Sequence, residues 1–258
     1  MIDLTERKLR ILQAIVSDFI RTAEPVGSRA LSRKHDMGVS PATIRNEMAD
    51  LEDMGYLTHP HTSAGRVPSD QAYRLYVNRL MDKYELAEKE KKRIRKELLS
   101  NITELEKTIK RASELLSELT NLTSFATLQE DMFRVSLFLE GMTRIFAHPE
   151  FNNVERARNF LEMVDHRDDF TATITERDDG ITITIGGENP GEIMPDSSII
   201  SATYHVGGHY VGKLGVIGPT RMRYGEITSV IDYMTKNIDR SFDLIDDRGG
   251  ADGADSQG

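Results

Sequence analysis

The sequence predicts an α+β protein made of two unlike halves. In residues 1–82, short apolar runs with helical spacing end at Gly or Pro, and a β-hairpin pattern follows them. In residues 121–242, apolar residues alternate along short strands before a closing helix. We expect residues 83–120 to form a linking amphipathic helix with coiled-coil-like spacing, and residues 243–258, rich in Asp and Gly, to form a disordered tail.

The composition excludes several classes of protein. A chain of 258 residues is long enough for two modest domains. It contains no Cys, which excludes disulfides and thiolate metal sites. No apolar run is long enough to span a membrane, and the N-terminus is charged where a secretory signal would be apolar. We therefore expect a soluble, cytoplasmic protein.

The first 55 residues predict three short helices. The first covers residues 4–22, with one apolar stripe and Thr5 as its N-cap. A Pro and a Gly break the chain before a second helix over residues 29–34, for which Ser28 is the expected cap. The third helix opens with Ser40 as its cap and a Pro at the first helical position, where the missing N–H costs nothing.

The third helix is followed by a hairpin pattern. Gly55 ends the helix, residues 56–59 and 66–68 are expected strands, and Ser69 can cap a fourth helix. Three short helices with a tight turn before the third, and then a hairpin, are the elements of a winged helix-turn-helix. In that fold the third helix enters the major groove of DNA and the hairpin forms the wing.

The residues expected to contact DNA lie at the start of the third helix, on the wing and at the start of the second helix. Arg pairs with guanine and Asn with adenine, whereas the wing and the second helix offer phosphate contacts. An alternative is that Arg45 pairs with Glu52 or Asp53 at the surface. The candidate residues are Ser28, Arg29, Ser40, Pro41, Ala42, Thr43, Arg45, Asn46, His61, Thr62, Ser63, Gly65 and Arg66.

The charge of the chain is unevenly distributed. The net charge is −9, but residues 1–80 carry 11 Lys and Arg against 10 Asp and Glu. The acidic excess therefore lies outside the expected DNA-binding domain. Because a nearly neutral domain binds DNA weakly by itself, a homodimer would be needed.

Residues 98–119 carry apolar side chains at the alternating spacing of heptads. Two interpretations remain open for so short a stripe: a dimerising coiled coil, or an amphipathic helix that lies on its own domain. The stripe consists of Leu98, Ile102, Leu105, Ile109, Ala112, Leu116 and Leu119.

The distal half has the pattern of an antiparallel sheet with helices. Strands are expected at residues 170–175, 181–185, 199–206 and 210–217, the last two joined by Gly207-Gly208. A helix over residues 154–164 is expected to bury Ala157, Leu161 and Val164. A closing helix over residues 223–242 is expected to bury Ile227, Val230, Ile231, Met234 and Ile238.

Several motifs are long and specific. They are EPVGSR (24–29), VSPATIRNEM (39–48), HTSAGRVP (61–68), HPEF (148–151), GENP (187–190) and GVIGPTRM (215–222). These motifs resemble the HrcA family of heat-inducible transcription repressors. Members usually carry more sequence between the linking helix and the stretch at residues 133–146, so this chain resembles a short form lacking much of the central GAF-like and dimerisation region.

The resemblance implies a dimeric repressor that binds an inverted-repeat operator, called CIRCE, upstream of chaperone operons. It also implies that repression depends on the GroE chaperonin, which unfolded proteins would occupy on heating. The C-terminal half would be a GAF-like domain.

Two other functions are alternatives to this one. An enzyme is disfavoured because His59 and His61 have no third metal ligand nearby, and the glycines of residues 207–218 are too loosely spaced for a phosphate loop. The sequence indicates no cofactor. The second alternative keeps the DNA-binding domain but makes the GAF-like domain a small-molecule sensor that controls other genes.

Overall fold

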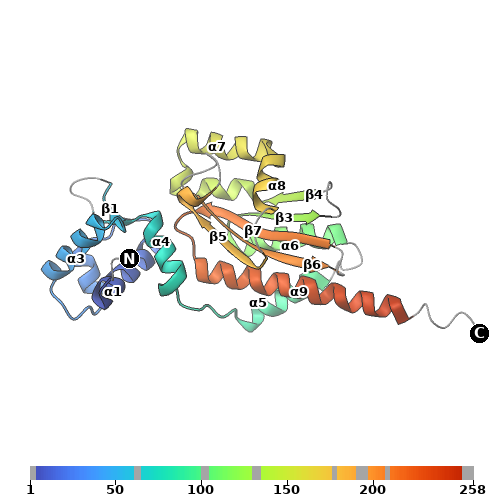
Figure 1. The fold of residues 1–258 in the computed structure, drawn as a ribbon, viewed down its shortest axis with the longest axis horizontal. Coiled ribbons are helices and arrows are strands. Elements are labelled where there is room, and N and C mark those ends of the chain that lie inside the picture. Colours follow the sequence, from blue (N-terminus) through green and yellow to red (C-terminus); the bar gives the residue numbers. More distant parts are fainter. Residues whose placement is uncertain are drawn as a thin grey trace, which may run out of the picture. The chain divides into compact units, whose positions relative to one another are not determined.

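The computed structural model describes residues 4–60, 65–99, 105–129, 135–175, 179–189, 197–206 and 210–251 (Figure 1). The chain divides into two compact units, Met1–Lys83 with Thr220–Gly225, and Tyr84–Pro219 with Glu226–Gly258. The expected linking segment, residues 83–120, thus belongs almost entirely to the second unit.

The first unit consists of short helices and one β-hairpin. Its helices are α1 (Glu6–Thr22), α2 (Ser28–Lys34), α3 (Pro41–Asp53) and α4 (Asp70–Leu75), which continues as a π-helical turn, η1 (Tyr76–Leu80). Strands β1 (Leu57–Thr58) and β2 (Val67–Pro68) pair antiparallel between α3 and α4. This order of elements confirms the predicted winged helix-turn-helix.

Side-chain caps begin three of these helices. The hydroxyls of Thr5, Ser40 and Ser69 each accept a hydrogen bond from the backbone N–H three residues later, at 3.1–3.3 Å. The start of α2 differs from the prediction, because Gly27 precedes the helix and Ser28 is its first residue. Ser28 is therefore not a cap.

The second unit is built on a five-stranded sheet in the order β4-β3-β7-β6-β5, with every pair antiparallel. Its strands are β3 (Thr123–Gln129), β4 (Val135–Glu140), β5 (Ile181–Ile185), β6 (Ser197–Val206) and β7 (Tyr210–Pro219). Its helices are α5 (Glu88–Leu99), α6 (Leu105–Thr120), α7 (Val154–Asp165), α8 (Arg167–Thr175) and α9 (Tyr224–Ala251), with 3-10 turns η2 (Met142–Ala147), η3 (Pro149–Phe151) and η4 (Gly186–Glu188). The predicted hairpin of β6 and β7 is confirmed by the pairing of Val206 with Tyr210.

Helices cover both faces of this sheet. Ser124 of β3 lies against Ser113 of α6, with 3.0 Å between their hydroxyl oxygens. The next residue, Phe125, packs edge-on against Phe170 of α8, with ring centroids 5.5 Å apart. Because successive residues of a strand face opposite sides, α6 and α8 cover opposite faces. Figure 1 shows α7 above the sheet and α9 below it, a three-layer arrangement that fits the GAF-like α+β domain.

The prediction of a strand at residues 170–175 is wrong, because this segment belongs to α8. Its Thr residues favour a strand in isolation. However, Phe170 and Ile174, four residues apart, are both buried in the core, at 2% and 1% exposure. Burial with helical spacing outweighed the local preference.

Two further predictions for the helices need correction. In α7 the buried residues are Phe160 and Met163, whereas Leu161 is 50% exposed. Ala157 and Val164 are half-buried, and Val164 packs against the core as expected. Apolar residues lie on more than one face of this helix, so spacing alone did not identify the inner one. The closing helix buries all five expected residues but continues to Ala251, so residues 243–251 of the predicted tail are helical. Residues 252–258 of that tail lie outside the described residues.

The prediction of one continuous heptad helix is also wrong. The stripe is divided between α5 and α6, with Ile102 outside the described residues. Arg93 of α5 pairs with Glu118 of α6, and Glu97 pairs with Arg111 at 2.9 Å, so the two helices run antiparallel. The buried members of the stripe, Leu98, Ile109, Ala112 and Leu116, are at most 1% exposed.

These four apolar side chains pack in the unit's own core. Leu105 and Leu119 are half-buried on the same helix. In the structure, the stripe therefore lies on amphipathic helices that pack on their own domain, which was the second interpretation.

Candidate nucleic-acid interface

The exposed surface of α3 is defined by how the opposite side of the helix is anchored. Ile44, Met48 and Leu51 are at most 4% exposed and hold α3 in the core of the first unit. Ser40 caps the helix at Thr43 N, at 3.1 Å. The residues left exposed near the start of α3 are Ser40, Pro41, Ala42, Arg45 and Asn46, with Thr43 half-buried.

Arg45 and Asn46 make no hydrogen bond or ion pair with any residue that the structure describes. The alternative partner for Arg45, Glu52, is engaged elsewhere, because its carboxylate pairs with His59 and with Arg66, the latter at 2.7 Å. An exposed guanidinium and an exposed amide on neighbouring residues can therefore be presented to a ligand without first breaking contacts with any described residue.

The wing is attached to the rest of the first unit at two places. Arg66 and Val26 exchange two backbone hydrogen bonds, each of 2.9 Å, which adds the segment before α2 to the hairpin. The Arg66 side chain reaches Glu52 of α3. Arg66, which we expected to contact DNA, thus also positions the wing. Residues 61–64 at the wing tip, with the candidates His61, Thr62 and Ser63, lie outside the described residues.

Gly65 is required by the close approach of two backbone segments. A Cβ at this position would lie 2.6 Å from the carbonyl carbon of Val26 and 2.7 Å from its oxygen. No side chain fits there without moving the backbone that the wing pairs with. The start of α2 completes the candidate surface, with Ser28 half-buried and Arg29 exposed.

An ion-pair cluster that the sequence did not reveal joins α1 to α3. Lys8 Nζ lies 2.6 Å from Glu47 Oε2 and 2.7 Å from Asp50 Oδ2, and Arg7 Nε donates to Glu47 at 2.6 Å. Glu47 is only 5% exposed. The hydrogen bond from Lys8 lowers the pKa of Glu47, with Arg7 acting in the same direction against desolvation. Bonds to Asp50 and Glu47 raise the pKa of Lys8.

This cluster predicts acid-sensitive stability. Because the pKa of Glu47 is lower in the folded state, its contribution is present above the ordinary value of 4.5 and is lost as the pH falls through the folded pKa. We expect Glu47→Gln to destabilise the first unit by about 1–3 kcal/mol at neutral pH and to flatten its decline in acid. Thermal melts from neutral to acidic pH measure this, with the exposed Glu24→Gln as control. Identical profiles for both variants and the wild type would contradict it.

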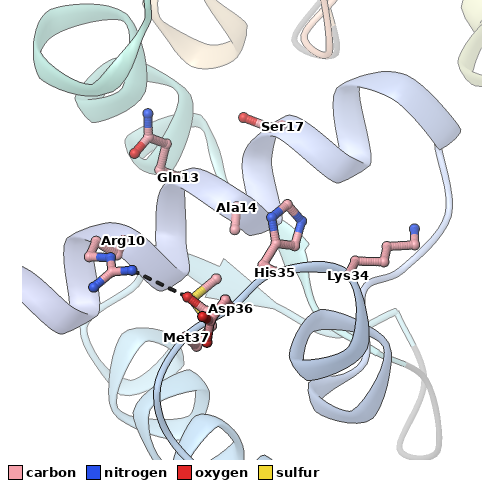
Figure 2. A pocket seen from close by; sticks show the side chains of 8 residues that line it. All are labelled: Arg10, Gln13, Ala14, Ser17, Lys34, His35, Asp36 and Met37. Carbon is pink, nitrogen blue, oxygen red and sulfur yellow. Dashed lines mark hydrogen bonds between the residues drawn. The ribbon is translucent and has the colours of Figure 1, made fainter.

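A surface hollow lies between α1 and the turn that leads to α3 (Figure 2). Arg10 of α1 crosses it and donates to the backbone oxygen of Asp36 at 3.3 Å. Asp18, 2% exposed on the same helix, lies 3.4 Å from His35 and 3.5 Å from Lys34. These contacts hold the helix-turn-helix on α1. A carboxylate on the otherwise apolar face of the first helix was the sequence signal that could have revealed them.

In the part of the chain that the structure describes, no three His, Asp or Glu residues are placed to hold a metal ion. Within the same residues, no helix has the length and apolar character needed to cross a membrane.

The fold and the exposed side of α3 define a winged helix-turn-helix DNA-binding protein. Residues 74–228 match the family model described as HrcA protein C terminal domain. The chain is 35% identical to the heat-inducible transcription repressor HrcA of Clostridioides difficile, over 92% of this chain and 99% of that protein. It is 33% identical to the repressor of the same name from Desulforamulus reducens, over 94% and 98%. The chain therefore belongs to the HrcA family of heat-inducible transcription repressors, which is not a family of enzymes.

The comparisons also confirm a short form. The two alignments extend over 339 and 340 positions, more than the 258 residues of the chain, so the relatives carry internal residues that the chain lacks. A solved structure described only as a hypothetical protein is similar in fold, with a TM-score of 0.74 at 19% identity over 93% of this chain and 99% of that one.

Proposed function

We propose that this protein represses heat-shock chaperone operons by binding an inverted-repeat operator of the CIRCE type, with α3 in the major groove. The observation that carries the proposal is the pair Arg45 and Asn46, which are exposed and without partners among the described residues. Arg45 would pair with guanine and Asn46 with adenine. Ala42 and the methyl group of Thr43 would meet thymine methyl groups.

Phosphate contacts would fix the position of α3 on the duplex. In this proposal they come from Ser28 and Arg29 at the start of α2 and from the wing, residues 61–66. Arg66 would act there mainly by holding the wing against Glu52. Such contacts supply affinity and register but do not distinguish bases.

A homodimer would bind the two halves of the repeat. Residues 1–80 carry nearly equal numbers of basic and acidic residues, so one copy would have little electrostatic affinity for DNA. Because Ile109 and Leu116 are buried in their own unit, we propose a dimer interface that does not use these two side chains. We further propose that the protein is cytoplasmic and that the GroE chaperonin maintains its activity, both on the ground of family membership.

The test is binding of the full chain to a labelled inverted-repeat duplex and to a scrambled duplex of equal length, at one salt concentration and with or without chaperonin. We expect a preference of at least about a thousandfold for the repeat. Sedimentation of the same sample reports the oligomeric state. Equal affinity of a folded dimer for both duplexes would refute operator recognition, and indifference to chaperonin would refute only the regulatory part.

A further inference from the structure

The first unit includes six residues that are distant in sequence from the rest of it, Thr220–Gly225. Residues 220–223 connect β7 to α9, and Tyr224 and Gly225 are the first two residues of α9, yet all six cluster with residues 1–83. The chain therefore leaves the second unit after Pro219 and returns to it after Gly225. At least one side chain of this segment, Tyr224, packs in the first unit's core.

Two side chains of the segment are buried. Met222 is 2% exposed and Tyr224 is 1% exposed. The Tyr224 ring packs against Tyr73 of α4, itself 1% exposed, with centroids 6.1 Å apart and ring planes tilted by 48°. The Tyr224 hydroxyl donates to the backbone oxygen of Thr220, which closes the segment on itself. Without these residues, Tyr73 would lose an aromatic neighbour.

The segment also contacts α1 and the residues that follow η1. Arg221 Nη1 donates to the backbone oxygen of Ile20 at 3.4 Å. That carbonyl is in the last turn of α1, where no helical N–H follows to satisfy it. A Cβ on Gly225 would lie 3.0 Å from the backbone oxygen of Asp82, so the chain passes closely here.

The helices that the segment contacts are those that position the DNA-binding surface. Lys8 of α1 binds Glu47 and Asp50 of α3. Ser69, the cap of α4, donates its hydroxyl to the backbone oxygen of Gly55 at 2.6 Å, at the end of α3. A shift of α1 or α4 would therefore move α3 and the base of the wing.

We propose that Thr220–Gly225 is a positioning element that the second part of the chain contributes to the DNA-binding unit, so that operator binding requires a folded second unit. The element acts through Tyr73 and the end of α1. The operator part of this inference rests on the proposed function, whereas the structural dependence does not.

The experiment uses the full chain with fluorine-labelled tyrosines, assigned by single Tyr→Phe variants. Tyr73 reports on the first unit. Tyr204 of β6, which is 0% exposed and whose hydroxyl donates to the backbone oxygen of Thr127 in β3, reports on the second. Urea titrations follow both resonances, and operator affinity is measured in parallel. In the wild type we expect both resonances and operator binding to be lost in one transition.

Tyr224→Ala should separate the transitions, with Tyr73 unfolding at lower urea than Tyr204, and should reduce operator affinity at least tenfold. Tyr224→Phe keeps the ring and should remain within about threefold of the wild type. The matched control is Tyr233→Ala, nine residues later on α9, where the hydroxyl accepts a bond from Arg95 within the second unit. In native buffer, this control should change neither the Tyr73 resonance nor the operator affinity.

Separate transitions in the wild type, or an unchanged Tyr73 transition in Tyr224→Ala, would overturn the proposal. If the wild type shows no operator preference at all, the proposed function fails. The urea transitions then still decide whether the segment supports the first unit.

Discussion

Replacing Arg45 with Ala is expected to lower operator affinity by about 1–3 kcal/mol. The side chain is exposed near the start of α3 and has no partner among the described residues, so its removal breaks no contact with them. The loss should therefore fall on binding and not on folding. A bidentate contact to guanine would also make the loss specific to the operator.

The measurement is binding to the operator and to a scrambled duplex at several salt concentrations. Arg79→Ala is the matched control, because it removes one exposed positive charge from η1 in the same unit. Arg45→Ala should weaken operator binding far more than scrambled binding, whereas Arg79→Ala should affect both slightly. If Arg45→Ala weakens both duplexes alike, Arg45 contacts phosphate and does not read a base.

Replacing Gly65 with Ala is expected to destabilise the first unit by about 1–3 kcal/mol and to reduce operator affinity as well. The added Cβ would meet backbone atoms of Val26 at 2.6–2.7 Å. Val26 cannot move freely, because its N–H and C=O are both bonded to Arg66. Relief of the clash must therefore displace the wing from the segment before α2.

Gly27→Ala is the matched control, at a glycine of the same unit that directly precedes α2. A Cβ at Gly27 meets no atom within 4 Å, so this variant should lose less than about 1 kcal/mol. Chemical denaturation and operator binding of both variants measure the difference. Equal behaviour of the two Gly→Ala variants would mean that the wing tolerates the displacement and does not contribute to binding.

The first unit was predictable because its signals are local. A capping hydroxyl at Ser40, the Pro that follows it and a terminating Gly55 each act over a few residues, and the structure confirms all three. Gly65 was expected on the wing as a DNA contact. Its steric role is visible only when Val26, far away in sequence, lies against it.

The second unit was less predictable because packing overrode local preference. The Thr-rich segment that became α8 and the heptad stripe divided between α5 and α6 are both explained by which side chains the sheet buries. For α7, Phe160 fits the core beside Phe146, with ring centroids 5.9 Å apart, and leaves Leu161 outside.

By itself, the sequence determined the winged helix-turn-helix, the residues that α3 exposes and membership of the HrcA family. Only the tertiary structure decided that Glu47 holds α1 to α3, that Glu52 holds the wing and that residues 220–225 complete the first unit. The physical reason is separation along the chain. Caps and turns involve neighbours a few residues apart, whereas Lys8 and Glu47, or Tyr73 and Tyr224, meet only after the chain has folded.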